Sequence, residues 1–407
     1  MTHALTTRPV PRGGRVAMAG LLALTAAVSP LPLAPAAAAP LPATARATVA
    51  PVTTPYLPDP TGPRPVGSTT LYLKDTSRPD PWVPTEKARE LMVTLWYPAA
   101  RKGRQRASYL TAKESELHLK GGRITTLPFD VLSTTRTNSF TDVKPAGRGH
   151  GLPLVVLSPG FTKPRATLSG LAEDLASHGY VVAAIDHTYE NYATTFPDGR
   201  IATCAACEFD DREDFGPKTV EVRAADVSFV LDELTGRHPK WKGASLIDRS
   251  RIAMVGQSIG GAGALGALAK EPRVRAAIDM DGTTYATLPE NGLTRPFLFL
   301  GAQQHHSPGQ DTRWDRDWAL LHGWKRWLVV AGAGHQSFTD IPLIVAEQLG
   351  VDLGYELKGS RSMEITRRYV RAFLDRHLRG VPQPLLDAPS SEYPEVKFCA
   401  PETKTCA

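Results

Sequence analysis

Residues 251–269 run Arg251-Ile-Ala-Met-Val-Gly256-Gln-Ser258-Ile-Gly260-Gly-Ala-Gly-Ala-Leu-Gly-Ala-Leu-Ala269, and this stretch decides the fold. Its first part is a short apolar run typical of a buried parallel strand, and its last part is a run of small residues typical of a closely packed helix. Gly256 and Gly260 flank Ser258 at the junction, where the absence of side chains permits a very sharp turn. The pattern predicts that Ser258 is a nucleophile. The alternative is an ordinary tight turn in an α/β protein.

The alternation of strand and helix continues on both sides of this stretch. It predicts a doubly wound, mostly parallel α/β sheet with helices on both faces, whose functional site lies in loops at the carboxyl ends of the strands. Residues 103–150 are expected to be an irregular excursion over the surface. Strands are expected at 69–75, 90–97, 154–157, 180–185, 252–255, 276–280, 297–300 and 327–330, and helices at 167–177, 220–234, 259–269, 314–321 and 361–379.

A serine nucleophile needs a base, and the base needs an acid that orients it. His335 follows the last apolar strand within a turn of small residues, which makes it the expected base; the alternative is a hydrogen-bonded loop histidine. For the acid, Asp279 and Asp281 lie two residues apart, so strand alternation does not separate them. Asp281 is favoured because it is nearer the loop and precedes a glycine, with Asp279 and Asp311 as alternatives.

An acyl-transfer site also needs two N–H donors for the negative oxygen of the tetrahedral intermediate. The backbone N–H of Ile259, directly after the nucleophile, is one expected donor. The second is expected from the loop Ser158-Pro-Gly160-Phe161-Thr162, where Gly160 lets the chain turn and present the N–H of Phe161. The alternative is an ordinary connection between a strand and a helix.

The first 47 residues have the composition of a secretory signal peptide and leader. They contain arginines and no acidic residue, then the apolar run 16–28, then small residues suited to cleavage. Prolines interrupt that run before it reaches the length of a membrane span, and no other stretch is long and apolar enough to span a bilayer. We therefore expect a secreted, extracellular protein. Its expected parts are the leader 1–47, an extended lead-in 48–66, a catalytic domain 67–380 and a C-terminal tail 381–407.

The cysteines agree with export, and the charge of the chain without its leader does not indicate nucleic-acid binding. The four cysteines form two close pairs, Cys204 with Cys207 and Cys399 with Cys406, and in an exported protein an even number favours disulfides over a zinc site. Four arginines precede residue 48, so the formal charge of +6 falls to about +2 once the leader is removed. No block of basic residues remains that indicates nucleic-acid binding.

The adjacent pair His305-His306 could ligate a metal, but neighbouring histidines on a loop more often point in different directions or line a pocket. The sequence leads us to expect no metal and no cofactor.

Taken together, these segments resemble the platelet-activating-factor acetylhydrolase family of the α/β-hydrolase superfamily. The resemblance implies an α/β-hydrolase fold, with Ser258 as nucleophile, Asp281 as acid, His335 as base, and the N–H groups of Phe161 and Ile259 as oxyanion donors. It covers about residues 67–350 and is carried by Pro153-Leu-Val-Val-Leu-Ser-Pro-Gly160-Phe161, Asp174–His187, Gly256-Gln-Ser-Ile-Gly-Gly261, Arg273-Val-Arg-Ala-Ala-Ile-Asp-Met-Asp281 and Gly334-His-Gln-Ser-Phe-Thr-Asp340.

Two departures from the family pattern flank the expected pocket. The family often has histidine where this chain has Gln257, and histidine where it has Pro159. The acyl preference of the family is therefore not carried over.

The expected function is that of a secreted serine esterase or lipase, with a small-molecule or lipid ester as substrate and, at most, transient contact with a lipid interface. A polyester hydrolase would use the same residues. A non-catalytic surface binding protein on a hydrolase scaffold and an amide hydrolase are the alternatives from other classes.

Overall fold

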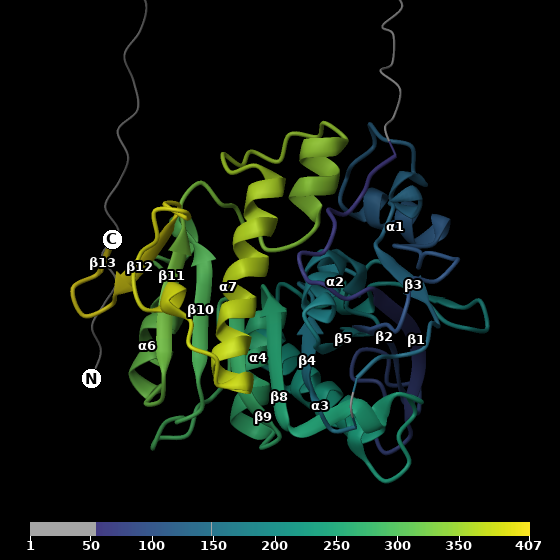
Figure 1. The fold of residues 1–407 in the computed structure, drawn as a ribbon, viewed down its shortest axis with the longest axis horizontal. Helices are drawn as coiled ribbons and strands as arrows, with labels where there is room; N and C mark the ends of the chain where they lie inside the picture. Colours follow the sequence, from purple (N-terminus) through teal and green to yellow (C-terminus); the bar gives the residue numbers. More distant parts are fainter. Residues whose placement is uncertain (1–53, 148) are drawn as a thin grey trace, which may run out of the picture. The chain divides into compact units, whose positions relative to one another are not determined.

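The computed structural model describes residues 54–147 and 149–407; the expected leader 1–47 and the first part of the lead-in lie outside these residues. The described chain forms a mixed sheet in the order β13-β12-β11-β10-β9-β8-β4-β5-β2-β1-β3, with a separate hairpin of β6 and β7 (Figure 1). The strands are β1 Val66–Asp75, β2 Arg89–Pro98, β3 Ser139–Thr141, β4 Leu152–Ser158, β5 Val181–Asp186, β6 Thr194–Thr195, β7 Ile201–Ala202, β8 Ile247–Gln257, β9 Val274–Met280, β10 Phe297–Ala302, β11 Lys325–Val330, β12 Val396–Ala400 and β13 Thr405–Cys406.

The centre of the sheet is parallel, because β4, β5, β8, β9, β10 and β11 are joined by helical crossovers. Strands β2 and β12 are antiparallel to their neighbours β5 and β11. The helices are α1 Ala112–Gly121, α2 Ser169–Ser177, α3 Phe215–Thr235, α4 Ile259–Lys270, α5 Gln303–His306, α6 Thr312–Leu320 and α7 Gly359–Arg379, with a π-helix over Pro342–Gln348.

Strand alternation assigns the helices to the two faces of the sheet. In β4, Leu154 and Val156 belong to the core that contains α3, α4 and α6, whereas Val155 and Leu157 belong to the core that contains α2 and α7. Both faces of the central strands are therefore buried, which explains why these strands are continuous apolar runs. The predicted doubly wound sheet is confirmed.

Part of the expectation for residues 103–150 was wrong. This region contains α1 and the short strand β3, not only irregular chain. The helix begins in a capping box: the Thr111 hydroxyl accepts from the Glu114 N–H at 3.1 Å, and the Glu114 carboxylate accepts from the Thr111 N–H at 2.8 Å. The spacing Thr-x-x-Glu that signals such a box is visible in the sequence, but the weak apolar periodicity behind it concealed the helix.

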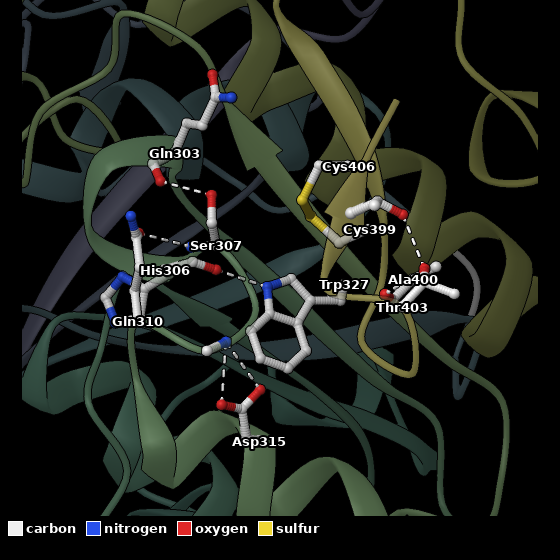
Figure 2. Close-up of a disulfide and its surroundings, with 12 residues drawn as sticks. Gln303, His306, Ser307, Gln310, Asp315, Trp327, Cys399, Ala400, Thr403 and Cys406 are labelled. Atoms are coloured by element: carbon white, nitrogen blue, oxygen red, sulfur yellow. Dashed lines mark hydrogen bonds between the residues drawn. A yellow bond between two sulfur atoms is a disulfide. The ribbon is translucent and has the colours of Figure 1, made fainter.

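The C-terminal tail also holds strands that were not expected. Strand β12 extends the sheet beyond β11, and the Cys399–Cys406 disulfide links it to β13 (Figure 2). The second disulfide joins Cys204 to Cys207 in the segment ahead of α3. Both predicted pairs are present.

The segment before β1 is attached to a helix near the other end of the chain. The Arg367 guanidinium of α7 donates to the carbonyls of Pro58 and Asp59 at 3.2 Å, and Arg371 donates to the Thr61 hydroxyl at 2.8 Å. Among the described residues, no helix has the length and apolarity needed to cross a membrane.

Candidate active site

Ser258 occupies a sharp turn between β8 and α4. Its backbone has a positive φ of 58° with ψ −130°, a conformation that residues with a side chain rarely adopt. The turn is so tight that a Cβ on Gly256 would lie 2.0 Å from the Gly260 carbonyl, and a Cβ on Gly260 would lie 2.1 Å from the Ser158 carbonyl oxygen. The two glycines of the motif are therefore required by backbone contacts. Ser258 itself is partly exposed at the carboxyl end of β8.

His335 connects Ser258 to Asp281 in one hydrogen-bonded line. Its Nε2 lies 2.9 Å from the Ser258 hydroxyl, and its Nδ1 lies 2.6 Å from Asp281 Oδ2. His335 comes from the loop after β11, so residues 77 positions apart along the chain meet at this point. The structure thus brings the predicted nucleophile, base and acid together.

Asp281 leaves strand β9 in a conformation that separates it from Asp279. Its φ is 60°, so the side chain no longer follows the alternation of the strand. The backbone N–H of Ala302 donates to its Oδ1 at 2.6 Å, and the His306 ring nitrogen Nδ1 lies 2.8 Å from the same oxygen. His305 Nδ1 lies 3.3 Å from Oδ2. Burial by itself would raise the pKa of the Asp281 carboxyl, but the hydrogen bonds from three histidines outweigh burial and hold that pKa well below its usual range.

The two alternative acids have other surroundings. Asp279 is fully buried, and its Oδ1 accepts from the Gly282 N–H at 2.9 Å. Burial raises its pKa well above the usual range, which favours the neutral acid. Asp311 caps α6 by accepting from the Arg313 and Trp314 N–H groups. Neither carboxyl is a hydrogen-bond partner of His335 in the described part of the chain.

His306 is a member of the site that the sequence did not identify. Its ring lies between two carboxylates, 2.8 Å from Asp281 and 3.2 Å from Asp311, and stacks on Trp314 at 4.1 Å. Its carbonyl accepts from the Trp327 indole N–H at 2.7 Å (Figure 2). Burial opposes the charged form, but the two carboxylates raise the pKa of His306 to about 9. The ring is therefore positively charged at neutral pH and stabilises the ionised Asp281.

The two expected oxyanion donors lie on either side of Ser258. Ile259 is the first residue of α4, so its N–H has no partner inside the helix. Phe161 follows Gly160, and a Cβ on Gly160 would lie 3.3 Å from the Ser258 Cβ. The loop therefore passes directly beside the serine.

An open cleft of about 800 Å³ exposes this arrangement to solvent. Aromatic rings form part of its wall: Phe161 packs edge-on against Phe215 at 4.9 Å, and Tyr285 lies under the Arg313 guanidinium at 4.2 Å. Most of the remaining lining is polar or charged, so the rings provide an apolar patch within a largely polar cleft.

A family model for platelet-activating factor acetylhydrolase, isoform II, matches residues 52–206 and 226–381. The chain belongs to this family. A probable 1-alkyl-2-acetylglycerophosphocholine esterase of Arthroderma benhamiae is 30% identical, over 84% of this chain and 93% of the relative. The platelet-activating factor acetylhydrolase of Canis lupus familiaris is 26% identical, over 58% of this chain and 59% of its own length. A solved ferulic acid esterase from Streptomyces cinnamoneus is 44% identical with a TM-score of 0.77, covering 86% of this chain and all of that one.

These similarities show an α/β-hydrolase fold and a carboxylic ester hydrolase of the EC 3.1.1 type. In this acetylhydrolase-family member, the two departures noted in the sequence differ, because Gln257 acts through its side chain and Pro159 through its backbone carbonyl alone. The Gln257 side chain is buried and donates to the His335 carbonyl at 2.8 Å, so it fixes the loop that carries the histidine. The Pro159 carbonyl accepts from Arg223.

This acetylhydrolase-family chain has a second Ser–His–Asp array behind the first. The Ser158 hydroxyl lies 2.9 Å from His187 Nε2, and His187 Nδ1 lies 2.8 Å from Asp226 Oδ2. Arg223 donates to the Ser158 hydroxyl at 3.1 Å, and Arg89 donates to Asp226 at 2.8 Å. All five side chains are buried, so solvent does not reach this serine.

The charges of the buried array determine its hydrogen bonds. Burial lowers the pKa of His187, as does the neighbouring Arg223, so the imidazole is neutral. Burial by itself would raise the pKa of Asp226, but Arg89 and His187 outweigh burial and lower it. The neutral ring then donates from Nδ1 to Asp226 and accepts from Ser158 at Nε2, while the Ser158 oxygen accepts from Arg223. Ser158 immediately precedes Pro159 and Gly160. Its hydrogen bonds with His187 and Arg223 therefore fix the start of the loop that carries Phe161.

Two groups of three side chains in the described part of the chain have metal-ligand spacing. One consists of Asp281, His305 and His306, and the other of His187, Glu190 and Asp226. In the first group, Asp281 already forms hydrogen bonds with His305 and His306. In the second group, Glu190 and Asp226 already form ion pairs with the buried Arg223 and Arg89.

Proposed function

We propose that this protein is an exported serine ester hydrolase that works through an acyl-enzyme on Ser258. The observation that carries the proposal is the hydrogen-bonded line from Ser258 through His335 to Asp281, set at a strained turn and open to a cleft. Membership of a family of ester hydrolases supports the reaction type.

The geometry supports the following steps. His335 Nε2 takes the proton of Ser258 as the hydroxyl oxygen attacks the ester carbonyl, and the resulting imidazolium is stabilised by the ionised Asp281. The N–H groups of Phe161 and Ile259 bind the oxyanion. His335 then gives its proton to the leaving alcohol, and the acyl group stays on Ser258. Water, deprotonated by His335, attacks the acyl-enzyme carbonyl. The bond to Ser258 then breaks, His335 returns the proton to the Ser258 oxygen, and the acid is released.

We infer that the preferred substrates are esters of aromatic carboxylic acids. The relative with the higher identity among those compared is named a ferulic acid esterase, and it is matched over its full length. Phe161, Phe215 and Tyr285 in the cleft wall offer rings against which an aromatic acyl group can pack. Acetyl esters of glycerophosphocholines are the second candidate, because the relative matched at 30% identity is named for that activity.

Export is part of the proposal. The composition of residues 1–47 and the two disulfides support a secreted protein. Purification of the protein from the culture medium, followed by sequencing of its N-terminus, would test this point. An intact N-terminus on protein retained inside the cell would contradict it.

The central experiment uses the wild-type protein and Ser258→Ala. We expect the wild type to hydrolyse p-nitrophenyl esters and to react with a fluorophosphonate at Ser258, and the variant to do neither while remaining folded. Labelling and turnover that persist in the variant would contradict the assignment of Ser258 as the nucleophile. A wild type that never labels would favour a binding protein, and amide turnover comparable to ester turnover would favour an amide hydrolase.

A substrate panel then separates the candidate esters. Methyl ferulate, a short-chain acetyl glycerophosphocholine, a triglyceride and a polyester film would be compared by kcat/KM or by release rate. We expect the aromatic ester to have the highest kcat/KM. A higher value for the phospholipid would replace the aromatic preference with the second candidate and leave the serine mechanism intact.

A further inference from the structure

An apolar cavity lies beside the cleft, between α1 and the π-helix over Pro342–Gln348. Its volume is about 180 Å³, and it is partly open to solvent. For comparison, an apolar protein cavity of about 150 Å³ is large enough to hold benzene. Most of the wall is aliphatic and comes from Leu119, Ile124, Leu132, Ile341, Ile344 and Val345.

Three polar side chains, Lys163, His118 and Gln336, line the same cavity. The half-buried Lys163 ammonium has no carboxylate within ion-pair distance in the part of the chain described, and it lies 5.8 Å from the centre of the Tyr192 ring. His118 Nε2 and Gln336 Oε1 are buried atoms with no hydrogen-bond partner. Native proteins rarely leave two buried polar atoms unpaired in one place.

The electrostatics of the cavity favour a ligand with one negative charge. Burial lowers the pKa of Lys163, which means that the cationic form is under-stabilised by its surroundings. Burial also lowers the pKa of His118 to about 4, so that ring is neutral at pH 7. A single cation matches a single anion. The unpartnered His118 Nε2 and Gln336 Oε1 are acceptors, so they can take hydrogen bonds from a hydroxyl or N–H group of a ligand but add none to its carboxylate.

We propose that this cavity is a binding site for a monocarboxylate with an apolar tail of about the size of a phenyl ring. The carboxylate pairs with Lys163, and the tail occupies the aliphatic wall. The site is distinct from the cleft, although two loops border both: Phe161 and His335 face the cleft, and Lys163 and Gln336 face the cavity.

The test is isothermal titration of the full-length protein with 3-phenylpropanoate, and with 3-phenylpropanamide as the neutral analogue. We expect saturable binding of one carboxylate per chain and at least tenfold weaker binding of the amide. Lys163→Met is expected to lose at least tenfold in affinity for the carboxylate. Lys163→Arg, which keeps the charge, should retain most of the affinity, and Lys242→Met on the exposed surface is the matched control.

A second arm separates this cavity from the cleft. The titration is repeated on protein phosphonylated at Ser258, in which the cleft is blocked, and on Ile344→Phe, in which the cavity is narrowed. We expect binding to persist in the first and to fall at least tenfold in the second. Absence of saturable binding to the unmodified protein, equal affinity in Lys163→Met, or loss of binding on phosphonylation would each overturn the proposal. Failure of Ser258 to react would instead count against the serine mechanism, and the unmodified protein would still test the cavity.

Discussion

The two Ser–His–Asp arrays of this protein have nearly the same hydrogen-bond lengths and very different settings. Serine–histidine distances are 2.9 Å in both, and histidine–aspartate distances are 2.6 Å at Asp281 and 2.8 Å at Asp226. Ser258 opens onto a cleft, beside Phe161 and Ile259, whose backbone N–H groups we propose as oxyanion donors. Ser158 is sealed in the core, and a guanidinium donates to its oxygen.

A line of hydrogen bonds from serine through histidine to aspartate does not by itself make the serine a nucleophile. Reaction requires space for a substrate, donors for the oxyanion and a hydroxyl oxygen that is free to attack. Among the described residues, the Ser258 array is the one that opens onto a cleft, and we propose that it also has the oxyanion donors. The Ser158 array uses the same hydrogen bonds to hold a loop in place.

The largest expected effect separates the two serines. Ser258→Ala should lower kcat by about 10⁶-fold, as removal of a triad serine does in other hydrolases, with little change in stability. Ser158→Ala should keep kcat within about tenfold but lower the free energy of unfolding by about 1–3 kcal/mol, because Arg223 and His187 lose a buried partner. Kinetics with a p-nitrophenyl ester and urea unfolding measure the two effects. An equal loss of kcat in folded Ser158→Ala would erase the distinction.

The next effect concerns the acid at the open site. Asp281→Asn should lower kcat by about 10⁴-fold, because an amide cannot hold the His335 ring in the required tautomer or stabilise its charge. Reactivity of Ser258 toward a fluorophosphonate should fall in parallel. Asp279→Asn is the matched control on the same strand, and a larger kcat loss there than in Asp281→Asn would reassign the acid.

The acid at the buried array should matter for folding more than for rate. Asp226→Asn removes the charge that compensates Arg89, so we expect the free energy of unfolding to fall by about 3–5 kcal/mol. The folded fraction should keep kcat within about tenfold. Asp232→Asn, on the exposed face of α3, is the control and should change stability by less than about 1 kcal/mol. Urea unfolding with parallel activity assays would show whether Asp226 instead acts in catalysis.

The smallest expected effect depends on pH. The pKa of His306 is about 9 in the folded protein against 6.5 for the free side chain, so its protonation stabilises the fold fully below pH 6.5. That contribution is lost as pH rises through about 9. His306→Gln should therefore be less stable than the wild type by about 3 kcal/mol at pH 6, and the gap should close toward pH 9.5. A gap that stays constant from pH 6 to 9.5 in urea unfolding would show that the ring is neutral throughout.

Chain order explains why one array was visible in the sequence and the other was not. Ser258, Asp281 and His335 each follow an apolar strand, and parallel strands bring their carboxyl ends to one edge of a sheet. His187 and Ser158 also lie at the ends of strands, but the loop that begins at Ser158 indicated only an oxyanion donor, and Asp226 lies within a long helix with no motif around it. Their meeting depends on how α3 packs behind the sheet, which periodicity does not reveal.

The same limit applies to smaller elements. Helix α1 has a capping signal but little apolar periodicity, because it covers the rim of a cavity rather than a broad core. Strand β12 is short and partly exposed. It forms by pairing with the backbone groups of β11, which would otherwise be unpaired on that side of the strand. The role of His306 depends on two carboxylates that only the folded chain brings near it.

The contacts between residues 58–61 and helix α7 have a consequence for biosynthesis. The carbonyls of Pro58 and Asp59 and the hydroxyl of Thr61 find their partners at Arg367 and Arg371, more than 300 residues later. During synthesis, the beginning of the domain therefore waits for nearly the whole chain before these bonds can form.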